Sequence, residues 1–418
     1  PLSPAPARFA YFPSAAFSLP PFPGLTHALR PMTLSPPMRT CRLALLPSLL
    51  VAALAGFVAP ASEPLPAPAG LEPPPLYLAE PFADVTFTGM PQQIATGGMQ
   101  PWPRWFAGAT GLVMTRTLPS GVATMQPVAA GQLRTSDASF GWPGGVDLHV
   151  GRWFGERQQH AVEFIYWGVY QMGDSATLAA GPPGIDAIPQ APGASVGGIP
   201  ASDFLTGAAQ QRIERADVVN DIEINWVYSL WDRPEFLPRE REVNLMWLAG
   251  FRFFQVNDQL TLTSGSGNPA IGAIDLGVAT NNNIYGGQVG AKFDWRFLPS
   301  LRFNVVPKFM IGGNAITNTS SLAGANGTQA TFAGGVPAQA YSELGVFSWL
   351  GSVDTGVAWD VTENWSLWLG YRVVGVGNIA QADGQWPSTI TSPESLSGIA
   401  AGTETIIHGG FAGFQSRY

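Results

Sequence analysis

Apolar and polar side chains alternate with a period of two along most of the chain after residue 103. In the clearest stretch, residues 285–297, one face carries only aromatic, aliphatic or small residues, and the other carries Gln288, Lys292, Asp294 and Arg296. Successive side chains of a β-strand point to opposite faces, whereas helical spacing would scatter both sets around the axis. The pattern therefore predicts that this part of the chain is built from strands.

Ten strands are predicted, and several of them exceed the length of about 5–6 residues that is usual in globular sheets. They cover residues 103–116, 144–154, 160–171, 218–229, 242–256, 283–297, 301–312, 344–361, 365–374 and 405–418. Shorter connections are expected at 155–159, 230–241, 298–300 and 362–364, and longer ones at 117–143, 172–217, 257–282, 313–343 and 375–404.

This regular change between short and long connections is typical of an outer-membrane barrel, which has tight periplasmic turns and long outer loops. We therefore expect an all-β fold, an antiparallel up-and-down transmembrane β-barrel of about ten strands (ten to twelve) within residues 103–418. An even strand number places both ends of the barrel on the periplasmic side. A soluble exported β-sandwich is the less favoured alternative, because nothing in that fold makes loop length alternate.

The first hundred residues show features of export. Residues 38–61 combine two arginines, an apolar stretch and the small-x-small run Ala59-Pro60-Ala61, which together predict a cleaved signal peptide. Residues 62–102 begin Pro-rich and are interpreted as a periplasmic lead-in, and residues 1–37 as an upstream extension without structure. The protein is thus expected in the bacterial cell outer membrane.

Composition agrees with a membrane location. The chain is 46% hydrophobic and only 12% charged, about half the charged fraction of a usual soluble domain. No apolar run after residue 61 reaches about 18 residues, which excludes a bundle of transmembrane helices. Of the 21 basic residues, four lie within residues 1–61 and none of the 29 acidic ones does, so the remainder is acidic and nucleic acid is not expected as a partner.

Polar residues on one face of the strands are expected to line the barrel lumen, because the lipid side must be apolar. They have mixed sign and are Glu163, Asp221, Glu223, Asn225, Arg252, Lys292, Asp294, Arg296, Arg302, Asn304, Lys308, Asp354 and Arg372. Two interpretations stay open, a charged pore and an interior network of ion pairs that plugs the barrel.

Aromatic residues next to the short turns predict a girdle at the periplasmic interface. They are Phe154, Trp226, Tyr228, Trp295, Phe297, Trp359, Trp365 and Tyr418. At the C-terminus, Ala412, Phe414 and Tyr418 share one face and resemble the signal that the barrel-assembly machinery recognises. The bilayer and this machinery are therefore the expected partners, and the oligomeric state is left open.

Three segments carry a family resemblance: 282–290 (NNIYGGQVG), 368–376 (WLGYRVVGV) and 407–413 (IHGGFAG), with a looser match at 105–109. The chain resembles the β-barrel porin family seven of planctomycetes over about residues 103–418. The resemblance implies an outer-membrane barrel. Because its motifs are strand patterns, it implies no catalytic or ligand-binding residue.

Signs of catalysis or metal binding are weak. The run 193–197 matches G-x-S-x-G, but it lies in a Pro/Gly-rich loop without the strand-to-helix context of a nucleophile. The histidines of the exported part, His149, His160 and His408, lack metal-ligand spacing, and Cys41 is the single cysteine. Asp217, Asp221 and Glu223 lack the loop geometry of a calcium site. No enzyme, cofactor or metal site is expected.

Two functions remain. The first is a passive, porin-like channel for small hydrophilic solutes, with selectivity set by the lumen charges and the long loops. The second is a non-conducting barrel whose outer loops form a surface, adhesive or structural module. Side chains fill the interior of a barrel of about eight strands, whereas open aqueous channels usually have about 16–18, so ten strands weaken the channel interpretation.

Overall fold

The structure is a computed structural model that describes residues 104–129, 131–231 and 242–418. The extension, signal and lead-in expected at 1–37, 38–61 and 62–102 lie outside these residues. Within the described ranges, no helix is both long and apolar enough to cross a membrane.

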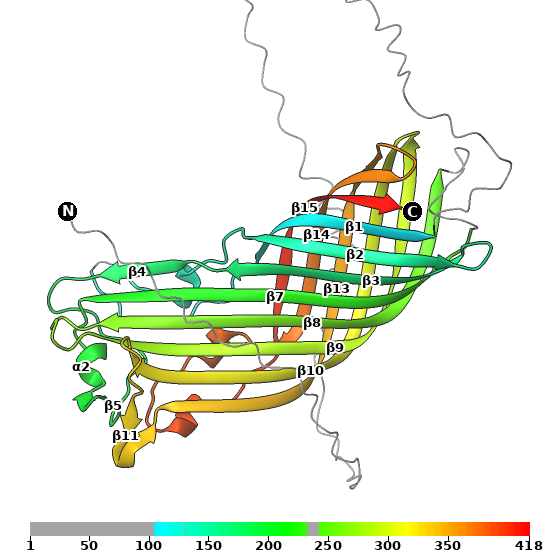
Figure 1. Ribbon diagram of the computed structural model, residues 1–418. Coiled ribbons are helices and arrows are strands. Elements are labelled where there is room, and N and C mark those ends of the chain that lie inside the picture. The colour runs from blue at the N-terminus through cyan, green and yellow to red at the C-terminus, as the bar shows by residue number, and fades with distance from the viewer. Residues whose placement is uncertain (1–103, 130, 232–241) are drawn as a thin grey trace, which may run out of the picture. The chain divides into compact units, whose positions relative to one another are not determined.

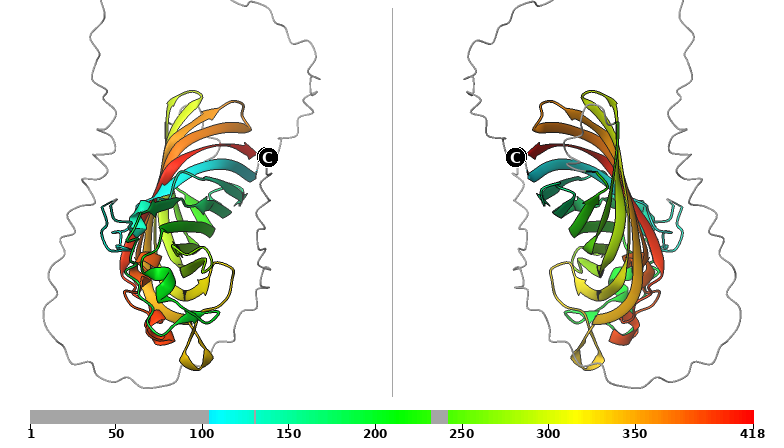
Figure 2. Two further views of the ribbon diagram at one scale, coloured as in Figure 1. Left: turned by 90° about the vertical axis from the view of Figure 1, so that its left-hand side faces the viewer. Right: turned by 90° about the vertical axis from the view of Figure 1, so that its right-hand side faces the viewer.

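Ten long strands form a closed antiparallel ring, in which each strand pairs with its neighbours in the chain and β1 pairs with β15 (Figures 1 and 2). The strands are β1 (Trp105–Arg116), β2 (Gly144–Phe154), β3 (His160–Met172), β7 (Gln210–Ser229), β8 (Val243–Gly265), β9 (Ala273–Leu298), β10 (Leu301–Gly324), β13 (Gln339–Asp360), β14 (Trp365–Ile379) and β15 (Thr403–Arg417). The predicted up-and-down barrel of about ten strands is confirmed.

Short elements gather at the long-loop end of the ring, away from the C-terminus (Figures 1 and 2). They are β4 (Ser175–Ala179), β5 (Ser195–Val196), β6 (Ile199–Pro200), α2 (Ser202–Leu205), β11 (Thr331–Phe332), β12 (Val336–Pro337) and the 3-10 turns η1 (Thr135–Asp137), η3 (Ala333–Gly335), η4 (Ala382–Gln385) and η5 (Pro393–Leu396). Together with the ends of the long strands they enclose an apolar core that includes Phe204, Leu262, Ile274, Leu322 and Ile390. We call this folded unit the extracellular cap.

The long strands reach further into the cap than the sequence predicted. Strand β8 runs on to Gly265 and β9 starts at Ala273, so residues 266–272 alone connect them and the predicted long loop at 257–282 is wrong. In the same way β10 runs to Gly324 and β13 starts at Gln339, which shortens the loop predicted at 313–343. The added segments are rich in Thr, Asn, Ser and Gly, and this loop-like composition hid their alternation.

The outer face of the ring has a clear apolar band. Exposed outward side chains include Trp226, Phe251, Val289, Phe309 and Leu369, as the alternation predicted. The band ends on one side of the barrel at a hydrogen-bonded chain across four strands, in which Tyr166, Asn220, Gln255 and Asn283 are linked by contacts of 3.1 Å each. Beyond this chain the outward residues of β8 are Asn257, Gln259, Thr261 and Thr263, which suit water and headgroups rather than hydrocarbon.

A lysine at position 289 tests the assignment of the faces. Val289 lies near the middle of the band and is 62% exposed, so Val289→Lys is expected to lower the free energy of unfolding in a bilayer by about 2–4 kcal/mol. Gln259→Lys, on the outer face beyond the band, should change it by about 0.5 kcal/mol or less. Chemical denaturation in lipid vesicles measures both, and equal losses would mean that the band is placed wrongly.

Candidate functional site

The thirteen residues predicted to line the lumen lie on the inner face of the ring. Ten of them are buried, and Lys292, Arg296 and Asp354 are partly exposed. Their inward direction follows from the strand parity that puts aromatic and aliphatic residues on the outer face. Most of these side chains pair with one another, as in Glu163–Lys292, Asp221–Arg252 and Asp354–Arg372.

The centre of the interior is a cluster of ions around Glu223 on β7. The Glu223 carboxylate accepts hydrogen bonds from Lys308 Nζ at 2.8 Å and from Gln288 Nε2 at 2.8 Å. Arg252 Nε lies 2.7 Å from Asp221 and 3.7 Å from Glu223. All these groups are buried, so each charge depends on its partner instead of on water.

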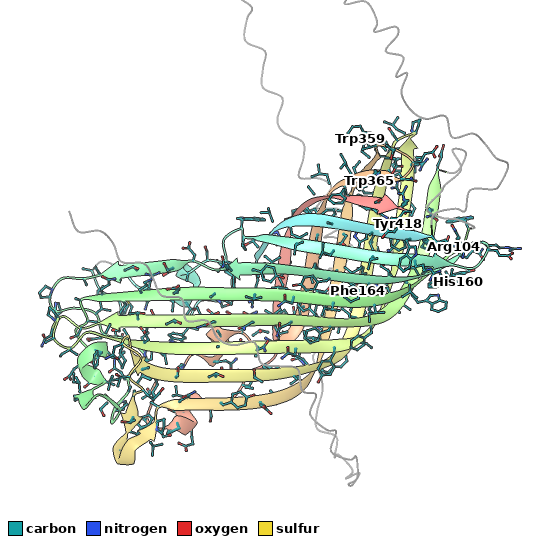
Figure 3. The ribbon with its side chains drawn as sticks, in the orientation of Figure 1. Arg104, His160, Phe164, Trp359, Trp365 and Tyr418 are labelled. Carbon is teal, nitrogen blue, oxygen red and sulfur yellow. The ribbon has the colours of Figure 1, made fainter. Side chains whose placement is uncertain are left out.

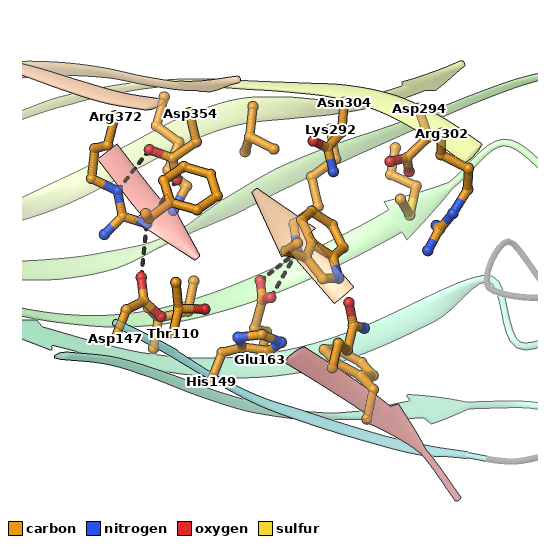
Figure 4. A pocket seen from close by; sticks show the side chains of 18 of the residues that line it. Thr110, Asp147, His149, Glu163, Lys292, Asp294, Arg302, Asn304, Asp354 and Arg372 are labelled. Carbon is orange, nitrogen blue, oxygen red and sulfur yellow. Dashed lines mark hydrogen bonds and ion pairs between the residues drawn. The ribbon is translucent and has the colours of Figure 1, made fainter. Parts of the chain in front are cut away.

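Between this cluster and the short turns lies a cavity of about 150 Å³, shown in Figure 4. Lys292 Nζ is 2.7 Å from the Glu163 carboxylate on the opposite wall. Arg372 bridges Asp147 and Asp354, each at 2.7 Å. The cavity therefore has a charged but internally paired lining.

A second group of ions joins β9, β10, β13 and β15 near the short turns. The Asp360 carboxylate on β13 forms ion pairs with Arg302 at 2.9 Å, Arg296 at 3.4 Å and Arg417 at 3.8 Å. It also accepts a hydrogen bond from the Ser366 hydroxyl at 2.7 Å. Three arginines from β9, β10 and β15 thus share one carboxylate on β13, and these ion pairs link the C-terminal strand β15 to β9, β10 and β13.

On the other side of the cavity, an apolar layer crosses the whole lumen. Nine of the ten strands contribute to it, and its members are 0–1% exposed: Met114, Trp167, Val219, Phe254, Ile284, Met310, Leu350, Val374 and Ile407. On each strand that carries both, the layer residue lies further from the short turns than the cavity residues do; on β10, for example, Asn304 and Lys308 precede Met310. The layer separates the cavity from the extracellular cap.

Above the layer, five ionisable side chains form an outer ionic cluster. Arg215 contacts Asp258 at 3.0 Å and Asp383 at 2.8 Å, and Arg116 contacts Asp217 and, at 3.5 Å, Asp258. Phe140 lies close to both guanidinium groups, with its ring centre 4.8 Å from Arg116 and 4.7 Å from Arg215. Asp383 and Phe140 come from long loops, so the cluster fastens these loops over the lumen.

Sequence reasoning missed most of the outer ionic cluster. Arg116 ended a predicted strand, Asp217 was considered as a calcium ligand, and Arg215, Asp258 and Asp383 fell in predicted loops. The signal that could have found Asp258 is its position. Asp258, Leu260 and Leu262 all lie on the inner face of β8, where they continue the period of two of the predicted strand 242–256.

The aromatic residues predicted for the girdle are all exposed on the outer face: Phe154, Trp226, Tyr228, Trp295, Phe297, Trp359, Trp365 and Tyr418. Figure 3 shows Trp359, Trp365 and Tyr418 at the end of the barrel that holds the short turns. Ala412 and Phe414 of the proposed C-terminal signal also face outward, and the Phe414 ring packs 5.8 Å from that of Trp365.

Groups typical of catalysis lie apart. Ser195 of the G-x-S-x-G run lies in β5 of the cap, whereas His149 lines the cavity. His408 is on β15, where its Nδ1 is 2.6 Å from the Tyr371 hydroxyl. In the part of the chain that the structure describes, no three His, Asp or Glu side chains are grouped to hold a metal ion.

Comparisons with solved structures find barrels of low similarity. The outer membrane protease OmpT from Escherichia coli is 11% identical, with 77% of this chain and 99% of that chain covered and a TM-score of 0.43. The toluene transporter TbuX of Ralstonia pickettii is 9% identical, with 76% and 90% covered and a TM-score of 0.26. Such values carry no argument about activity. No curated protein matches the chain.

A protein-family comparison is more informative. The model described as "Putative beta barrel porin-7 (BBP7)" matches residues 138–404, which is more than half of the chain. This range contains β2 to β14, most of the cavity wall and most of the apolar layer. The family resemblance expected from the strand motifs is confirmed. The chain belongs to the beta barrel porin-7 family and is an outer-membrane β-barrel.

Proposed function

We propose that this outer-membrane barrel does not conduct solutes and acts at the cell surface through its extracellular cap. The observation that supports the proposal is the apolar layer, whose side chains come from nine strands and are 0–1% exposed. A passive channel for small hydrophilic solutes needs a water-filled path, and hydrated solutes would have to cross this layer. Moving polar groups into such an apolar region without hydrogen-bond partners costs several kcal/mol for each group.

The cap supports the second half of the proposal. Its loops pack around a shared apolar core and are tied to the strands by buried ion pairs such as Arg215–Asp383. Long loops with a fixed structure of this kind usually serve a function rather than merely connect strands. A rigid surface presented outside the membrane suits a structural or adhesive role, and the proposal includes no catalytic step.

Solute flux into liposomes tests the proposal. Liposomes that contain the folded protein should swell in urea or arabinose no faster than protein-free liposomes, whereas a general porin reconstituted in parallel should cause rapid swelling. A swelling rate that decreases steadily with increasing size of the solute would show a water-filled pore and would contradict the proposal.

A further inference from the structure

The cavity below the apolar layer is built like a binding site rather than a segment of a channel. The apolar layer separates it from the extracellular cap, so a ligand would enter from the end of the barrel that holds the short turns. Its volume of about 150 Å³ matches that of an apolar protein cavity able to hold benzene. The site therefore suits a ligand of about ten non-hydrogen atoms at most.

Three of the four carboxylates of the cavity wall form ion pairs with cations. Glu163 is paired with Lys292, and Asp147 and Asp354 are paired with Arg372. Three hydrogen-bond donors, in contrast, have no hydrogen-bond partner among the described residues: Asn304 Nδ2, Trp368 Nε1 and Arg372 Nη1. These three groups can each donate a hydrogen bond to a ligand.

Asn304 is the most informative of these donors. Its side chain lines the cavity, the residue is only 4% exposed, and Figure 4 shows it beside Lys292 and facing Glu163. Buried amides in native proteins are almost always hydrogen-bonded, because an unsatisfied donor costs about 1–3 kcal/mol. A ligand oxygen between Asn304 and Lys292 would remove this cost.

Trp368 extends the donor site on the same wall. The Arg302 guanidinium carbon lies 5.9 Å from the centre of the Trp368 ring, and Arg302 is two residues from Asn304 on the inner face of β10. Asn304, Trp368 and Lys292 all line the cavity, and an amide, an indole N–H and an ammonium group are donors that suit the oxygens of a carboxylate.

The rest of the wall is apolar. Besides the indole ring it includes Phe106, Ile165, Met246, Val306 and Phe411. Such a surface favours a hydrocarbon body over a polyol, because a sugar would leave hydroxyl groups unpaired against it.

From this arrangement we infer that the cavity binds a small monocarboxylate with an apolar body, entering from the periplasm. The carboxylate would accept hydrogen bonds from Asn304 and Trp368 next to Lys292, and the body would contact Phe106, Met246 and Phe411. This inference goes beyond the closed-lumen proposal, which would stand even without a ligand.

Isothermal titration calorimetry of the folded protein with benzoate tests the inference. Benzoate should bind saturably, and benzyl alcohol, which keeps the ring but lacks the carboxylate, should bind at least about tenfold more weakly. Asn304→Leu should weaken benzoate binding by about tenfold or more. Asn304→Asp, which keeps the shape but brings a negative charge, should abolish it.

Two outcomes overturn the inference. If benzoate does not bind to the wild-type protein, the cavity holds water only. If benzoate and benzyl alcohol bind equally and both Asn304 variants leave the affinity unchanged, the ring alone is partitioning into apolar surface. Denaturation curves of the two variants identify any that fail to fold; Trp368→Phe, which removes the indole N–H and keeps an aromatic ring, then serves as the second variant and should also weaken benzoate binding.

Discussion

Replacing Glu223 by glutamine is expected to lower the free energy of unfolding by about 3–5 kcal/mol, because it leaves buried cations without their counter-ion. Lys308 and Arg252 both lie against this carboxylate, and none of the three side chains is more than 5% exposed. Water cannot replace the lost charge at such a depth. Chemical denaturation of the protein folded in detergent or lipid measures the change.

The chain offers a matched control for this substitution. Glu214 lies on the same strand and also has a basic partner, Arg212 at 3.1 Å, but its side chain is 58% exposed. Glu214→Gln should therefore change the free energy of unfolding by less than about 1 kcal/mol. A double variant, Glu223→Gln with Lys308→Met, should recover part of the loss, since the unpaired cation is gone. Equal effects of the two single glutamine substitutions would contradict the buried ionic cluster.

Replacing Arg215 by methionine is expected to release the extracellular cap. The buried guanidinium donates to Asp258 and Asp383 and to the carbonyl oxygens of Thr135 and Ala138, so it joins β8 to two long loops. Losing one partner of such buried pairs costs about 3–5 kcal/mol. The loops at 117–143 and 375–404 should then become accessible to proteases while the transmembrane part of the barrel stays folded.

Limited proteolysis of proteoliposomes, with the cut sites identified by mass spectrometry, measures this release. Arg212→Met is the control, because Arg212 lies on the same strand with its side chain 47% exposed. The control should be cut like the wild type. If Arg215→Met resists proteases as well as the wild type does, the outer ionic cluster does not hold the loops.

Much of the barrel could be predicted because its alternation is strict where one face meets lipid. The bounds of β2 agree with the predicted strand 144–154, and Val289 and Lys292 lie on the faces that were assigned. The hydrocarbon region excludes polar side chains from the outer face, so apolar and polar residues alternate clearly along the strands there.

The prediction failed where the environment of the strands changes. Beyond the lipid band the inner face of β8 carries Leu260 and Leu262, packed in the cap, and its outer face carries Thr261 and Thr263. The apolar residues have moved from the outer to the inner face. The period of two persists in these segments. Because their outward residues are polar, however, they were interpreted as loops rather than as strands.

The apolar layer could not be predicted from the sequence. Val306 and Met310 look like interruptions of a polar face, yet Met310 is fully buried in the apolar layer and Val306 lines the cavity. A single strand cannot reveal that eight others place an apolar side chain at the same depth. Likewise, Asp383 meets Arg215 only because a long loop folds back over the ring.

The central claim is that the apolar layer closes the lumen, and single-channel recording of the wild-type protein in planar lipid bilayers tests it most directly. The folded state is checked first by its resistance to unfolding in detergent at low temperature. The account predicts a flat baseline at all voltages that the bilayer withstands. Steady conductance steps of uniform size that scale with salt concentration would contradict it.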